Sequence, residues 1–421
     1  MSLRERAREG FFRHGWLLPL AIVAGYAFGR ALAVLLLLIY LLWAALALRR
    51  DDLPLLPRPL LLLHAVWLIG FGLGIPWALD GKDAAGAWLK LLGMGAALPI
   101  TWIALRRVAG WRAPLAFWAA LACALVMAKF LGGMALAGLV QGWEGMAKGH
   151  NGMIAACLFP LALAPLLGHR KRYGRHAAMA LTLMFLLALV FKDSRTEVLM
   201  VLSGLATLVA FHTSRRQLLA FLAGAILLTA GALAVMHKGN TWDGTSGDGA
   251  GWFAELDIYS SGRLTLWRGA LEHPPANPWV GVGLLNVRHY REVFGGLAAK
   301  HLHNLFLDTW YDAGGLGLIA LLALLGHLGG RALRGLHPRR DGSAPWLAAT
   351  AATLVTLQLD HSYNSVTFAP FLLFVLAVLA RIAEEGAPRP PPGQVEAPAI
   401  LNSRKNGTQR ARRNTETTES V

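Results

Sequence analysis

The sequence predicts an all-α polytopic membrane protein. Of its 421 residues, 55% are hydrophobic and 15% are charged, and apolar runs of roughly 20 residues, the length that a helix needs to cross hydrocarbon, recur along the chain. A soluble protein with this pattern would need several helices that are apolar all round and buried on every side. The net charge of +16 comes from basic residues clustered between apolar runs, which indicates membrane topology and no nucleic-acid partner.

The apolar runs predict about twelve spans. Residues 15–48 exceed the length of one span, and Arg30 near their middle predicts two short helices joined at a tight turn. Seven spans follow before a long polar segment, and three come after it. These ten spans lie at 59–79, 87–106, 113–139, 151–168, 177–193, 196–211, 217–236, 305–330, 344–361 and 365–382.

The basic loops predict the orientation. With twelve spans, the segments "RERAR", "LRRDD", "RRVAGWR", "HRKRYGRH", "SRRQ" and "RALRGLHPRR" and the C-terminal tail all fall on one face. Because cytoplasmic loops carry the excess of Lys and Arg, both termini are expected inside. The chain is then divided into spans one to nine (1–236), a long outer loop (237–302), spans ten to twelve (303–383) and a disordered basic cytoplasmic tail (384–421).

The long outer loop is expected to be partly helical. Its 66 residues are too many for a plain connector, and loops of this length in compact proteins are usually functional or disordered. In "SSGRLTLWRGALEH", serines precede a helix-compatible run in which Leu264, Trp267 and Leu271 share a face. This pattern predicts a short amphipathic helix at the membrane surface.

Arg195 is a candidate anion site. It lies in "FKDSRTEVL" between two apolar spans, where a charge is costly and usually faces a cavity, the bundle interior or the interface. A guanidinium offers a fixed donor fork for phosphate oxygens; the structural alternative is snorkelling or pairing with Asp193 or Glu197. Arg263 opens the predicted loop helix and is expected to border its membrane-facing side. For Arg288, in "NVRHYREVF", contact with anionic lipid headgroups is the more ordinary interpretation.

The stretch "KHLHNLFLDTW" places His301 and His303 in front of an apolar run. On a strand the two side chains would share a face, whereas on a helix they would lie about 200° apart and could not jointly ligate a metal. No HExxH or CxxC spacing occurs, and both cysteines lie within predicted spans, so no metal or cofactor is expected. A single histidine can act as a general base near neutral pH; the structural alternative is an interfacial residue at the end of a span.

A carboxylate closes a later span. Asp360 in "LVTLQLDHSYNS" lies at the outer end of its apolar run. It would orient a histidine or bind a sugar hydroxyl, or would simply be solvated at the membrane boundary.

Taken together, "DSR" at a span end, "GRLTLWRGAL…NPWVGVG" in one long outer loop and "HNLFLDTWYDAGGLGLIALL" opening the next span resemble the O-antigen ligase (WaaL) family. The resemblance implies a GT-C-like fold and a multi-pass protein of the bacterial inner membrane with its active site in the periplasm. It implies transfer of O-antigen from undecaprenyl pyrophosphate to the lipid A core, without a metal or a nucleotide.

Residue by residue, the resemblance matches Arg195 and Arg263 to the family's essential arginines and His303 to its essential histidine. Asp360 corresponds to a late acidic position. Arg288, His301 and Asn304 are then candidates for positioning substrates. An O-antigen polymerase or a protein O-oligosaccharyltransferase shares the same lipid donor and remains an alternative. A lipid-linked sugar flippase is an alternative of another class, although the concentration of candidate residues on one face favours interfacial catalysis.

Overall fold

A computed structural model describes residues 2–141, 151–168, 180–186, 188–189, 195–212, 257, 260, 262–290, 292–294, 301–338, 341–359 and 368–386. The chain forms two compact units, Met1–Glu385 and Gly386–Val421, and the description below concerns the first. All regular structure in the described residues is helical, as predicted. The helices are α1 Leu3–Arg13, α2 Leu18–Phe28, α3 Arg30–Ala47, α4 Arg58–Leu73, α5 Gly81–Gly95, α6 Ala97–Arg107, α7 Arg112–Gln141, α9 Asn151–Gly168, α11 Arg195–His212, α14 Arg263–Glu272, α15 Leu305–Gly335, α16 Ala344–Leu359 and α17 Phe368–Gly386, with 3₁₀ turns η1 Gly15–Leu17, η2 Arg50–Leu55, η3 Ile75–Trp77 and η4 Asn286–His289.

Several of these helices are long and apolar enough to cross a membrane. Five qualify within the described residues, and a sixth does if α1 with η1 and α2, which are bent by 48°, count as one span. Three further apolar helices are shorter: Gly152–Leu163, Thr196–Phe211 and Ala344–Leu359. The protein is therefore a multi-pass membrane protein. Twelve spans remain a prediction, because span 217–236 and part of 177–193 lie outside the described residues.

Exposed apolar side chains support the membrane assignment. Leu42 on α3 and Leu62 on α4 are 67% and 65% exposed, and α7 and α15 carry similar residues. Such surfaces are unfavourable in water and normal against lipid tails. The tight turn predicted at Arg30 is also present: α2 ends at Phe28, and α3 begins at Arg30 after Gly29, whose φ is +154°.

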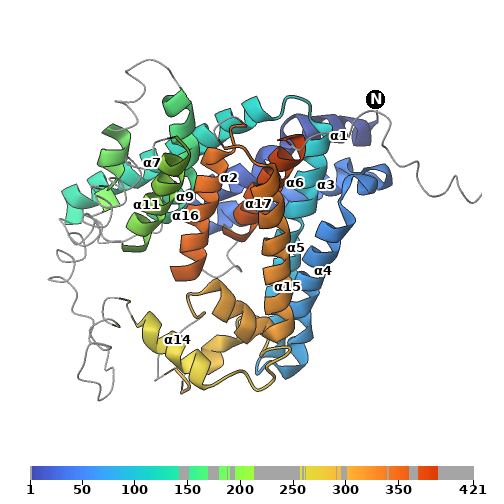
Figure 1. Cartoon of the computed structure of the whole chain (residues 1–421), viewed down its shortest axis with the longest axis vertical. Coiled ribbons are helices and arrows are strands. Elements are labelled where there is room, and N and C mark those ends of the chain that lie inside the picture. Colours follow the sequence, from blue (N-terminus) through green and yellow to red (C-terminus); the bar gives the residue numbers. More distant parts are fainter. Residues whose placement is uncertain are drawn as a thin grey trace, which may run out of the picture. The chain divides into compact units, whose positions relative to one another are not determined.

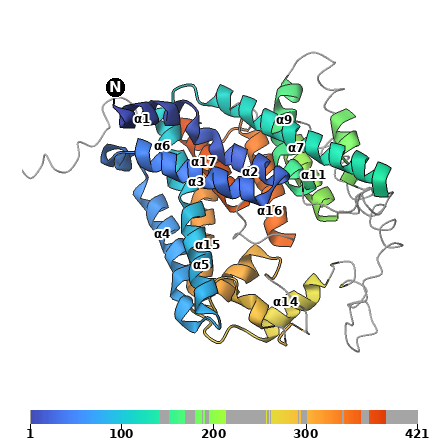
Figure 2. The same ribbon diagram turned by 180° about the vertical axis from the view of Figure 1, so that it is seen from behind.

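Two groups of helices make up the described bundle. In one, α4 packs along α15 and α5, as the two views show (Figures 1 and 2). The α4–α15 approach is close because a Cβ on Gly70 would lie 3.2 Å from the Cα of Gly317. In the other group, α9 contacts α7, α11 and α16, while α2 packs on α3.

Ion pairs gather the ends of several helices. Asp52 in η2 accepts from Arg8 of α1 at 2.7 Å and from Arg107 of α6 at 2.8 Å. Glu384 of α17 joins α6 to α15 in the same way. The full set, here called the arginine network, is Arg8, Arg106, Arg107, Arg112, Arg331 and Arg381 with Asp52, Glu384 and Glu385. Four of the basic loops predicted to share a face thus meet at one end of the bundle; which face is cytoplasmic remains a prediction.

Helix α15 is broken, which the predicted span 305–330 did not anticipate. Gly314 has φ +65° and ψ −170°, outside the helical region. The continuous part from Gly315 to Gly335 rises about 30 Å, close to the thickness of the hydrocarbon core. Arg331 of the arginine network lies near its far end, so the segment before Gly314 lies at the opposite end of the bundle.

Candidate functional site

The backbone groups freed by the break in α15 are bound by the loop that precedes it. The amides of Val282 and Gly283 donate to the carbonyls of Tyr311 and Asp312 at 2.8 and 3.1 Å, and the amide of Gly315 donates to Pro278 O at 2.7 Å. Non-helical backbone at membrane depth persists only where protein or water satisfies it. The "NPWVGVG" segment therefore holds the first part of α15 in place.

Helix α14 packs onto this first part of α15 through a small apolar core of its own. Its members are Leu266, Ala270, Val282, Val287, Phe294, Leu302 and Tyr311. The helix predicted from the sequence is thus present. Its N-cap is Gly262, and Ser260 Oγ just before it accepts from Leu264 N at 3.2 Å. Leu266, Gly269 and Ala270 are buried and Trp267 packs against this core, whereas Leu271 of the predicted apolar face is 64% exposed. The membrane-facing role of that face stays a prediction. The core is formed by residues distant in sequence, which periodicity over ten residues does not capture.

His301 and His303 lie next to each other in a turn ahead of α15. Their ring centroids are 4.2 Å apart with an interplanar angle of 54°. The helix begins only at Leu305, and His303 has φ +54°, in the left-handed region. The helical geometry that would have separated the two histidines therefore does not apply to this histidine turn, residues 301–304.

Leu302 clamps the histidine turn from both sides. Its amide donates to Asp308 Oδ1 at 2.6 Å, and its carbonyl accepts from Trp267 Nε1 of α14 at 2.8 Å. Its side chain is fully buried. Asp308 and Trp267 were missed as candidates. An acid in an apolar run is itself a signal of a functional or structural task, but the Trp267 contact spans 35 residues and has no local signature.

Arg263 is held beside this turn. It lies four residues before Trp267, so the two side chains share one face of α14. Its Nη1 donates to Ser260 O at 2.9 Å, and its side chain is half-buried. Asn304 caps α15, with Oδ1 accepting from Phe306 N and Leu307 N at 3.0 and 3.1 Å.

Arg288 forms a separate contact with the α4–α5 connection. It forms an ion pair with Asp83 near the start of α5. Beside it, Asn286 is buried and accepts from Asp80 N at 2.8 Å. Asp80, Asp83 and His289 place their ligand atoms within 4.8 Å of one another, and Arg288 supplies positive charge to this cluster. The ion pair of Arg288 therefore joins η4 to the start of α5.

The start of α11, at Arg195, lies close to the end of α16, at Leu359. Arg195 is the first residue of α11, and its side chain lies outside the described residues; so does Asp360, which follows Leu359, the last residue of α16. Thr356 contacts Met200, and a Cβ on Gly204 would lie 3.4 Å from Ala348 O. These contacts make α11 and α16 antiparallel, so the start of one meets the end of the other.

The same end of the bundle holds these two termini and the histidine turn. Helix α16 starts beside the arginine network, where Arg112 donates to Asp341 O at 2.8 Å, so Leu359 lies at the far end, about 24 Å away along the helix. Near this end Glu197 is completely buried, and its carboxylate lies against Gly152, where a Cβ would come within 2.2 Å of Oε2. The start of α9 therefore packs against the start of α11.

Comparison with known families identifies this region. A sequence model of a family described as O-antigen ligase matches residues 177–322. Over these residues the chain is similar to the O-antigen ligase family. The matched segment contains α11, α14, the histidine turn and the break in α15, and the family assignment indicates an enzyme of the transferase kind. No curated protein matches the chain significantly.

Within the O-antigen ligase segment lie six of the seven residues predicted for the site; Asp360 follows it. The structure joins α14, which carries Arg263, to the histidine turn through Trp267, and it places the backbone of Arg195 at the same end of the bundle. Among the described residues, no contact joins Arg288 to the histidines. The side-chain oxygen of Asn304 caps α15.

Proposed function

We propose that the protein is an O-antigen ligase: an inverting glycosyltransferase that needs no metal and moves O-antigen from undecaprenyl pyrophosphate to the lipid A core. The reaction takes place on the periplasmic face of the inner membrane. The observation that carries the proposal is the family match over 177–322, because that segment contains His303, Arg195 and Arg263.

The two arginines stabilise the leaving group. A lipid pyrophosphate departs as a stable anion, so catalysis needs cations at the phosphates and no proton donor. Arg195 and Arg263 supply guanidinium forks, which match phosphate oxygens and stay charged when desolvated. Their helices start at the same end of the bundle, which supports joint recognition of one pyrophosphate.

His303 acts as the general base. It takes the proton of the acceptor hydroxyl while that oxygen attacks the anomeric carbon, and the bond from this carbon to the pyrophosphate oxygen breaks on the opposite side. Configuration at the anomeric carbon is inverted in a single displacement. The left-handed backbone of His303 and the clamp on Leu302 support this role, since a base must be held in one geometry. His301 and Asp360 contact substrate or orient it.

Reconstitution with purified substrates tests the function. The protein should transfer polysaccharide to lipid A core in a mixture with lipid-linked O-antigen, and a chelator should leave the rate unchanged. Chelator-sensitive transfer would contradict the metal-free mechanism. Extension of the lipid-linked chain without lipid A modification would identify a polymerase, labelling of a polypeptide a protein glycosylase, and donor movement without a new glycosidic bond a flippase.

A further inference from the structure

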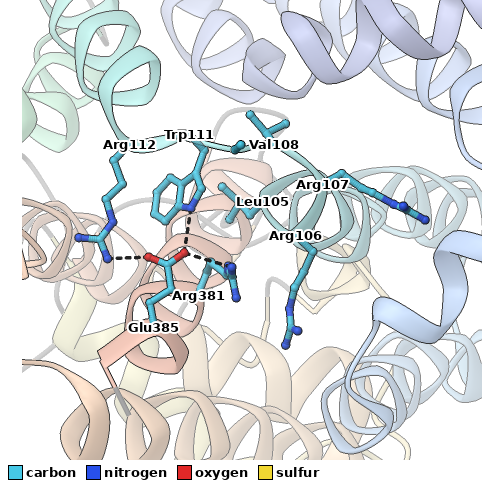
Figure 3. Close-up of a pocket in the computed structure, with 10 residues that line it drawn as sticks. Leu105, Arg106, Arg107, Val108, Trp111, Arg112, Arg381 and Glu385 are labelled. Carbon is cyan, nitrogen blue, oxygen red and sulfur yellow. Dashed lines mark hydrogen bonds and ion pairs between the residues drawn. The ribbon is translucent and has the colours of Figure 1, made fainter. Parts of the chain in front are cut away.

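A cavity at the end of the bundle opposite the histidine turn has no part in the proposed reaction. It is lined by the α6–α7 turn, the start of α7 and the end of α17, with a volume of about 340 Å³. This is within the range of small-ligand pockets. In Figure 3, Arg112, Trp111 and Arg381 converge on Glu385, while Val108 and its neighbours form the turn beside them.

Arginines outnumber the carboxylates that they bind here. In the arginine network each carboxylate accepts from two or three guanidinium groups, at 2.6 to 3.4 Å. Six arginines face three acids, so three positive charges are uncompensated within the network. Because a guanidinium has five N–H donors, sharing one carboxylate leaves donors for another acceptor.

The pocket arginines are fixed by Glu385 but keep N–H donors that could bind a further acceptor. Arg112 lies over the Trp111 ring at 5.5 Å and donates to Glu385 Oε2 at 2.8 Å, yet 45% of its side chain is exposed. Arg381 donates to Glu385 at 3.1 Å, and its Nε is buried without a hydrogen-bond partner among the described residues. A fixed, partly exposed pair of forks with spare donors is the arrangement that binds phosphate oxygens.

The floor of the pocket leaves room for an anion. Val108, Ala109 and Gly110 form a turn of small residues, and Gly110 has φ +64° with open space where a Cβ would be. Basic pockets of this kind between membrane helices recognise phosphate-bearing headgroups. We propose that this pocket, formed by Arg112, Arg381 and the 108–110 turn, binds a phosphate-bearing anion at a site separate from catalysis. The inference does not rest on the proposed glycosyl transfer.

Binding to the full-length protein tests the site. The protein would be placed in phosphatidylcholine nanodiscs with and without phosphatidylglycerol, and in detergent with inorganic phosphate; retained lipid would be counted by native mass spectrometry and affinity measured by thermal shift. Arg112→Gln should weaken binding roughly tenfold, as expected from the loss of one charge-assisted hydrogen bond. Arg334→Gln is the matched control, because this exposed arginine on α15 donates to Gly330 O of its own helix.

A second variant separates binding from folding. Glu385→Gln removes the negative charge from the pocket, so it should tighten phosphate binding although it also breaks ion pairs. Opposite effects of Arg112→Gln and Glu385→Gln would support the site; weaker binding in both, or no change in either, would overturn it. Retention of phosphatidylglycerol alone assigns a lipid headgroup, whereas equal competition by inorganic phosphate assigns a soluble anion. Equal retention of phosphatidylcholine and phosphatidylglycerol would refute anion recognition.

Discussion

At the scale of single residues, the two histidines differ in backbone and not in location. Their rings are in contact, but His303 alone has the left-handed backbone, and Asn304 behind it caps α15. When one of two adjacent imidazoles is substituted, the other can act as the general base. Both histidines must therefore be tested.

His303→Ala should abolish transfer, because it removes the imidazole that takes the proton of the acceptor hydroxyl. His301→Ala, the matched control from the same turn, should keep measurable activity. Rates in the reconstituted assay, with membrane insertion checked for both variants, decide the matter. Wild-type activity of His303→Ala, or complete loss in His301→Ala alone, would exchange the two assignments.

Arg195→Lys should keep the charge but lose the donor fork, so the rate should fall by roughly tenfold to a hundredfold. Arg268→Lys is the control, since Arg268 is exposed on α14 and pairs with Glu272. The assay is transfer at saturating acceptor with varied lipid donor. Undiminished rates in Arg195→Lys would refute bidentate phosphate recognition.

Trp267→Phe should lower kcat about tenfold while the donor KM changes little. The variant keeps an aromatic ring but loses the indole N–H that donates to Leu302 O, and this hydrogen bond positions the histidine turn. The exposed Trp279 provides the control, and Trp279→Phe should behave as wild type. If Trp267→Phe lowers thermal stability but leaves kcat unchanged, the contact is structural only.

At the scale of elements, the break in α15 sets the position of the candidate site. The turn "NPWVGVG" supplies the hydrogen bonds that the broken helix lacks, and the histidine turn, α14 and the start of α15 share one apolar core. A continuous helix would leave no unpaired backbone groups at Gly314 for "NPWVGVG" to bind.

Gly314→Ala should destabilise the protein by several kcal/mol. Its positive φ disfavours a side chain, and a Cβ would lie 2.2 Å from the carbonyl carbon of Trp279. Gly326→Ala in the same helix has open space around it and should be neutral or slightly stabilising. Thermal unfolding in detergent compares the two, and equal midpoints would show that the break is not required.

At the scale of the whole molecule, the arginine network ties together segments that are up to 377 positions apart, from Arg8 to Glu385, because Asp52 and Glu384 bind the neighbouring residues Arg107 and Arg106. Asp52 is its most buried member. Hydrogen bonding to Arg8, opposed by burial, lowers the pKa of Asp52 to about 2. Because the pKa is lowered on folding, the resulting stability is present above the ordinary value near 4 and is lost as pH falls toward 2.

Asp52→Asn should therefore reduce the free energy of unfolding at neutral pH by about 2 kcal/mol. The difference from wild type should shrink below about pH 4, where the unfolded carboxyl is protonated. The exposed neighbour Asp51 gives the control Asp51→Asn, with a much smaller effect expected at every pH. Unfolding midpoints across pH test this, and a constant difference down to pH 2 would contradict the pKa shift.

The sequence by itself determined that the protein is an all-α membrane protein; it also predicted that the basic loops share a face and indicated which residues to consider at the site. These properties are local: hydrophobic length, charge clusters and short motifs are visible in single segments. Helix positions follow as well, as at Arg30, although Asp80 caps α5 and starts that helix at Gly81, six residues before the predicted span.

Only the tertiary structure decided how the candidate residues meet. The turn that brings His301 against His303 is held by the hydrogen bond from Trp267 to Leu302 O. The pairing of α11 with α16 brings the backbone of Arg195 to the end of α16. Arg288 forms its ion pair with Asp83. Each contact joins residues separated by dozens or hundreds of positions or requires a positive φ. Periodicity cannot report them, because it reflects which face of a helix is apolar and not which partner that face finds.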